Sequence, residues 1–205
     1  MKKLLATSLL ASILIPPVHA AGEGSSLDFG PLAPLIGTWK SVEAGIDVAP
    51  GQEGSSVGKG GPAVEQFTEV ITFEPAADAT NASDQYLTAL YYKQEVFKKS
   101  DGSKFHDQRG YLIYDKKNQI VYNSFCVPRA TCVVAEGKAG EKMTLVANSD
   151  AVAESKFMKE NASTTGFSFT IEISDEILSY SQVTNLEIYG KPFAHSDSSK
   201  LKKVK

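Results

Sequence analysis

The chain has 205 residues, a formal net charge of −3 and 42% hydrophobic residues. This length suffices for one domain with a sizeable core. The acidic balance argues against a nucleic-acid-binding surface, because such a surface needs an excess of Lys and Arg to displace counterions from phosphates.

Residues 1–20 have the pattern of a secretory signal peptide. Two lysines precede a short apolar stretch, and "PPVHA" then offers a cleavage site after Ala20. The apolar stretch is too short to span a bilayer, and no cysteine follows it that could carry a lipid anchor. We therefore expect a periplasmic or secreted protein without a membrane span in its mature form, with a linker over residues 21–27 and one domain over residues 28–205. Cleavage would leave 19 basic and 24 acidic residues, a net charge of −5.

The folded part opens with a short helical turn predicted for "GPLAPLIG", followed by a strand at "TWKSVE". Residues 47–64 are rich in Gly, Pro and Ser, which predicts a long loop. From residue 65 onward apolar and polar residues alternate in most segments, which is the period of a β-strand with one buried face. The predicted strands cover residues 66–75, 85–99, 104–115, 119–127, 131–137, 142–148, 155–161, 165–174 and 176–190.

Short turns join these segments, and no long segment keeps an apolar period of 3.6 residues. The pattern predicts an all-β fold, an antiparallel up-and-down β-barrel of about ten strands with a short helical turn near its N-terminus. Closure into a barrel would remove the exposed edge strands. A β-sandwich is the alternative.

Polar side chains fall on the face of the last predicted strand that should point inward. Gln182 and Thr184 stand between Tyr180 and Leu186 in the alternation. A barrel that encloses a ligand cavity could hold a few oriented polar groups there. The alternative is that a bulge shifts the face and these residues point outward.

The two cysteines of the chain flank a short turn, in "NSFCVPRATCVV". If residues 128–130 form a three-residue hairpin loop, Cys126 lies opposite Cys132, and opposed residues lie within disulfide range. An exported protein meets an oxidising compartment, so we expect a disulfide, the alternative being a reduced pair. Closing so short a loop should contribute only roughly 2 kcal/mol.

Only two histidines, His106 and His195, follow the predicted signal peptide. A structural zinc site needs more His and Cys ligands, and the chain has neither a Gly-x-Ser-x-Gly nor a His-Glu-x-x-His motif. The remaining chemistry is that of one or two imidazoles in an aromatic, apolar barrel, which suits heme. Taken alone, each histidine is more commonly a surface or packed residue than a ligand.

Three motifs in their order resemble the nitrobindin family of heme-binding β-barrels. These motifs are "PLAPLIGTW", "FHDQRGYLIYD" and the ending "LSYSQVT…GKPFAHSDSSKL", which together span most of residues 28–203. The resemblance implies a barrel similar to fatty-acid-binding proteins that holds heme b with ferric iron, Fe(III). It also implies weak binding of nitric oxide and isomerisation of peroxynitrite to nitrate.

The resemblance assigns roles to individual residues. His195 matches the axial heme ligand, with Asp197 or a backbone carbonyl as a partner for its second ring nitrogen. His106 matches the histidine across the pocket, and Thr184 falls where the family often has a methionine lining the distal space. Trp39 and Tyr111 match family positions for which a structural role serves equally well.

The chain departs from the family pattern in several places. Gln108 replaces a family glutamate, the Gly-x-Gly after the Trp is missing, and the spacing after the last His is one residue longer. An alternative function stands beside heme binding. This alternative is a carrier, similar to lipocalins or fatty-acid-binding proteins, that holds an apolar small molecule without iron. A barrel that only mediates protein contacts is a third. The sequence does not define the oligomeric state.

Overall fold

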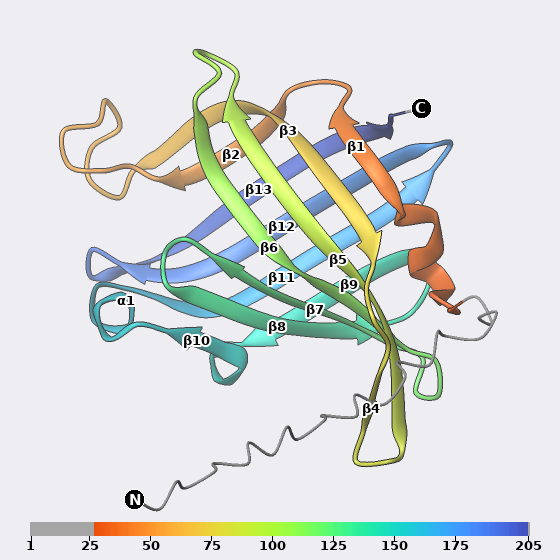
Figure 1. The fold of residues 1–205 in the computed structure, drawn as a ribbon. Coiled ribbons are helices and arrows are strands. Elements are labelled where there is room, and N and C mark those ends of the chain that lie inside the picture. The colour runs from red at the N-terminus through yellow and green to blue at the C-terminus, as the bar shows by residue number, and fades with distance from the viewer. Residues whose placement is uncertain (1–26, 205) are drawn as a thin grey trace, which may run out of the picture.

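The computed structural model describes residues 27–204, and the predicted signal peptide and most of the predicted linker lie outside them. Most of the described chain is β-strand (Figure 1). The elements in chain order are η1 (Gly30–Leu35), β1 (Gly37–Ser41), β2 (Gly45–Pro50), β3 (Pro62–Pro75), β4 (Ala79–Asn81), β5 (Gln85–Lys98), β6 (Lys104–Asp115), β7 (Ile120–Val127), β8 (Thr131–Lys138), β9 (Lys142–Asn148), η2 (Ser149–Ala151), β10 (Val152–Glu154), α1 (Lys156–Asn161), β11 (Ala162–Ser174), β12 (Ile177–Ile188) and β13 (Lys191–Lys203).

The strands close into a ten-stranded antiparallel barrel with extra strands, which confirms the predicted fold. The ring runs from β2 through β13, β12, β11, β9, β8, β7, β6 and β5 to β3, and β3 returns to β2. β1 pairs with both β3 and β13, so that β1 and β2 together act as one interrupted strand of the wall. Closure leaves no long free edge in the ring, and the sandwich alternative is wrong.

The alternation of residue types explains which side chains fill the barrel. Along β5 every second residue from Thr88 to Val96 is buried, and the residues between them are half-buried. The core contains Leu90 and Leu112 from adjacent strands, together with Leu145 and Leu178 from the other side of the ring. Burial of these apolar side chains supplies most of the driving force for folding.

One end of the barrel is closed by the turn that the sequence predicted near the N-terminus. Leu32 and Leu35 of η1 are almost fully buried, and Trp39 at the start of the wall is 2% exposed. The indole N–H of Trp39 donates a hydrogen bond of 2.7 Å to the carbonyl of Leu35, which ties the turn to β1. Figure 1 shows η1 at one end, with the β2–β3 loop, the β12–β13 turn and α1 at the other.

Two local predictions were wrong. Residues 155–161, predicted as a strand, form the cap residue Ser155 and the helix α1. The Ser155 hydroxyl accepts a hydrogen bond from the backbone N–H of Met158, and the helix interior contains good helix formers. The predicted loop over residues 47–64 is shorter, since β2 continues to Pro50 and β3 begins at Pro62.

Within the described residues, none of the helices is long and apolar enough to cross a membrane.

Candidate functional site

A cavity occupies the half of the barrel away from η1. Its volume is about 1060 Å³, counting the space that opens to solvent. None of the buried residues of η1 lines it. His106 from β6, Thr184 from β12 and His195 from β13 all line this one cavity, although they lie far apart in the sequence. Aromatic side chains form part of the wall, including Phe125 and Phe167, whose ring centroids are 5.1 Å apart.

His195 lies between two carboxylates. Its Nε2 is 2.7 Å from Oδ1 of Asp47 on β2 and 3.6 Å from Oδ1 of Asp197 on its own strand. Burial alone would lower the pKa of His195, but the hydrogen bonds and charges of Asp197 and Asp47 outweigh burial and raise that pKa to about 9. The amide of Gln182 donates a hydrogen bond of 2.9 Å to Asp197, which holds this carboxylate beside the ring. The second carboxylate is one that the sequence interpretation missed, because Asp47 falls in the predicted loop.

His106 presents a free ring nitrogen. Its Nε2 is buried and has no hydrogen-bond partner among the described residues. Burial lowers the pKa of His106, and Arg129 adds to this effect, so the imidazole is neutral near pH 7. Because this nitrogen has no protein partner, it can serve a ligand either as a donor or as an acceptor, depending on the tautomer of the ring.

Thr184 lies directly beside His195 in the wall. The two residues are paired across the β12–β13 ladder, and opposed residues of an antiparallel pair point to the same face. This register places the inward-pointing polar groups predicted for β12 in the cavity, so the bulge alternative does not hold there. The register shift between β11 and β12 lies between Thr164 and Gly166, opposite Leu186 and Asn185, and the pairing of Thr184 with His195 is regular.

A hydrogen-bonded floor of polar residues lies deeper in the barrel. Gln94 and Tyr180 both donate to Oε2 of Glu69, at 2.6 and 3.1 Å. Burial raises the pKa of Glu69, which favours its neutral form.

A second chain of bonds runs beside the first. Gln108 donates to the Tyr92 hydroxyl at 2.6 Å, and that hydroxyl donates to Asn123 at 2.9 Å. Gln108 matches a position where the family has glutamate. Here its uncharged amide acts as a hydrogen-bond donor in a buried network. A neutral amide avoids the cost of burying a charge there.

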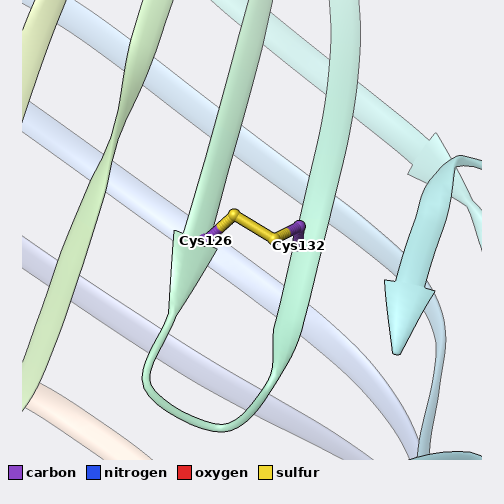
Figure 2. The surroundings of a disulfide bond; sticks show 2 residues. All are labelled: Cys126 and Cys132. Atoms are coloured by element: carbon purple, nitrogen blue, oxygen red, sulfur yellow. A yellow bond between two sulfur atoms is a disulfide. The ribbon is translucent and has the colours of Figure 1, made fainter. Parts of the chain in front are cut away.

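A disulfide links the two strands of the β7–β8 hairpin at the mouth of the cavity. Cys126 lies opposite Cys132 in the β7–β8 ladder and is joined to it, with Cα atoms 4.1 Å apart (Figure 2). The loop between the strands carries Arg129, a cavity-lining residue that the sequence interpretation also missed. No other lysine or arginine is among the described residues that line the cavity.

Two family-matched residues lie outside the cavity. Trp39 packs at the closed end, where its role is structural. Tyr111 is 46% exposed and packs edge-on against Tyr91, with ring centroids 5.7 Å apart. Neither residue contributes to the candidate site.

The side chains that line the cavity are of the kinds that bind heme. A planar apolar macrocycle needs apolar and aromatic walls, which Phe125, Phe167 and Leu186 supply, and its iron needs an imidazole nitrogen. Two imidazoles face the cavity, and the buried Nε2 of His106 lacks any protein partner. The lining therefore offers the kinds of side chain that a porphyrin and its iron require.

The sequence model of the THAP4-like, heme-binding beta-barrel domain matches residues 28–203. No curated protein matches the chain. The crystal structure of Rv2717c from M. tuberculosis is similar in fold, with a TM-score of 0.59 and 17% sequence identity over 85% of this chain and 95% of that chain. The family match covers almost the entire described barrel, and so the chain belongs to the THAP4-like heme-binding β-barrel domains, which is the nitrobindin family.

Proposed function

We propose that the protein binds ferric heme in the barrel cavity with His195 as the axial ligand, and that the bound heme handles nitric oxide or isomerises peroxynitrite to nitrate. The observation that carries this proposal is the presence of two imidazoles, His106 and His195, in one apolar cavity of a heme-binding family. Heme would supply a Lewis-acidic ferric iron with one coordination position open to a small ligand.

The carboxylates beside His195 support a ligand role. A ligating imidazole uses one nitrogen for the metal and donates the other N–H to a carboxylate or carbonyl, which fixes the ring and raises its basicity. Asp47 fits this partner role, with its Oδ1 2.7 Å from Nε2, and Asp197 lies 3.6 Å from the same nitrogen. This arrangement leaves Nδ1 for the iron.

His106 suits the opposite side of the pocket. Its Nε2 is unpartnered, so the tautomer protonated at Nε2 could donate a hydrogen bond to an anion or to nitric oxide held in the cavity. Thr184 and the surrounding apolar side chains would restrict the space and exclude water.

Hemin titration tests the proposal. Purified protein should give a Soret band that shifts on addition of nitric oxide, and His195→Ala should abolish the shift. His106→Ala is the matched control, since it removes an imidazole from the same cavity. This variant should keep the band but respond differently to nitric oxide. A protein that binds apolar fluorophores, gives no Soret band with hemin and ignores His195→Ala would instead be a carrier of apolar small molecules.

We propose further that the protein is exported to the periplasm or secreted. The signal-like residues 1–20 and the Cys126–Cys132 disulfide support an oxidising destination. N-terminal sequencing of the protein recovered from the periplasm or medium should begin at Ala21. Recovery of an uncleaved, reduced chain from the cytoplasm would contradict export.

A further inference from the structure

The charged groups around the cavity are unevenly distributed. Asp47 and Asp197 lie beside His195, so the inner wall there carries two carboxylates. Arg129 lies on the β7–β8 loop at the mouth and is the only lysine or arginine that lines the cavity in the described part of the chain. The imidazolium of His195 offsets one of these carboxylates and leaves a net negative charge there, so the carboxylate groups of an otherwise apolar ligand would be favoured at Arg129 and disfavoured beside His195.

Arg129 has no protein partner among the described residues. The other arginine of the chain, Arg109, pairs with Asp107 and Glu95, and Lys104, which borders a neighbouring hollow with Arg129, pairs with the same two acidic residues. Between residues 27 and 204, no salt bridge or side-chain hydrogen bond engages the Arg129 guanidinium. This group is free to meet an anion and presents a planar fork that matches a carboxylate.

The hairpin holds Arg129 in a defined place. The disulfide joins the residues directly before and after the five-residue segment that contains Arg129. Ala130 follows with a φ of +56°, a left-handed conformation that completes the tight loop. Ordering the loop in advance lowers the entropy that a ligand must overcome on binding.

We propose that Arg129 forms a carboxylate-binding subsite that anchors a heme propionate at the mouth of the cavity, held in position by the Cys126–Cys132 disulfide. This inference rests on the proposed heme function. Heme carries its two propionates on one edge, so the macrocycle enters with its apolar edge first. That orientation keeps the propionates away from Asp47 and Asp197 and places them at Arg129 and solvent.

The test compares porphyrins with and without free carboxylates. Arg129→Gln should weaken binding of hemin about twofold to fivefold, the upper range of an exposed ion pair. It should weaken iron-free protoporphyrin IX by a similar factor, read by porphyrin fluorescence, and it should leave hemin dimethyl ester unchanged. Lys138→Gln is the matched control, because it removes the same charge from the exposed far end of β8. This variant should bind all three porphyrins as the wild type does.

The role of the disulfide is tested in the same assay. In the Cys126→Ser/Cys132→Ser background, Arg129→Gln should have a smaller effect on hemin binding, because the loop no longer holds the guanidinium in place. An Arg129→Gln variant that binds hemin as tightly as the wild type would overturn the inference while leaving heme binding intact. Equal losses for hemin and its dimethyl ester would also overturn it, since Arg129 would then act through the fold and not through a carboxylate.

Two further outcomes separate this inference from the proposed function. If iron-free protoporphyrin binds and responds to Arg129→Gln but hemin gives no ligand-dependent Soret shift, the carboxylate subsite stands and axial ligation fails. If the wild-type protein binds no porphyrin at all, both proposals are overturned.

Discussion

Removal of the Cys126–Cys132 disulfide should lower the stability of the barrel by a small, calculable amount. The bond closes a loop with a sequence separation of six residues. The chain-entropy relation gives roughly 2 kcal/mol for so short a loop. Cys126 is exposed and Cys132 is half-buried, so serine substitutions leave no large cavity and bury no unpaired hydroxyl deep in the core. The β7–β8 ladder extends from Ile120 opposite Lys138 to Val127 opposite Thr131 and should survive without the bond.

Urea unfolding followed by tryptophan fluorescence is the suitable assay. The chain has one tryptophan, and Trp39 is buried at the closed end, far along the chain from the hairpin, so its signal reports global unfolding. The Cys126→Ser/Cys132→Ser variant should lose about 2 kcal/mol with an unchanged m-value, or about 4–8 °C in Tm for a domain of this size. Wild-type protein under reducing conditions should match the variant, and the variant itself should not respond to reductant. A loss above about 4 kcal/mol would refute the loop-entropy reasoning, because the bond would then be needed for strand pairing itself.

Two other substitutions probe the interior. Burial raises the pKa of Glu69 in the folded protein, whereas in the unfolded chain this carboxyl ionises near its ordinary pKa of about 4.5. The folded state therefore binds the proton more tightly than the unfolded state. The free energy of unfolding should consequently fall as pH rises above about 4.5. Glu69→Gln should reduce this fall, measured by urea unfolding across pH, and Asp47, whose pKa burial also raises, should account for part of what remains. Glu74→Gln, at an exposed site on the same strand, should keep the full fall, and parallel pH profiles for the wild type and Glu69→Gln would contradict the assignment. Gly30→Ala should cost about 2–4 kcal/mol by the same assay, because a Cβ at this position, where φ is +51°, would collide with the buried ring of Tyr114. Gly102→Ala, where φ is +71° and the space is open, should cost only about 1 kcal/mol, and equal costs at the two positions would show that the collision is relieved.

The barrel could be predicted from the sequence because its strands obey the expected alternation. Along β11, Phe167 and Ile171 fall on one face and are buried in the structure. The helix α1 was missed because "SKFMKEN" is short, and its Ser cap and helix-forming residues were outweighed by the strands around it. Local propensity was the better guide at this point, and the surrounding pattern misled.

Asp47 shows why part of the site could not be predicted. In β2 the apolar Ile46 is 36% exposed, while Asp47 on the opposite face is 7% exposed, so the usual rule for burial is inverted. The neighbouring loop is rich in Gly, which further disguised the strand. The partner of Asp47, His195, lies 148 residues away in the sequence, and only barrel closure brings the two together. No local pattern contains that information.

The polar residues on the inward face of β2 and β13 are themselves an argument for ligand binding. A barrel that only filled its own interior would be more stable with apolar residues in place of Asp47, His195 and Asp197, because buried ion pairs seldom repay their desolvation. Two polar atoms of cavity-lining residues, Nε2 of His106 and Oγ1 of Thr131, are buried without partners, and an unsatisfied group costs about 1–3 kcal/mol. Costs of this kind concentrate where function requires them. A ligand that offers a metal to one imidazole and a hydrogen-bonding group to the other would relieve them, whereas a purely apolar ligand would leave them in place. The side chains that line the cavity therefore favour heme over an apolar molecule.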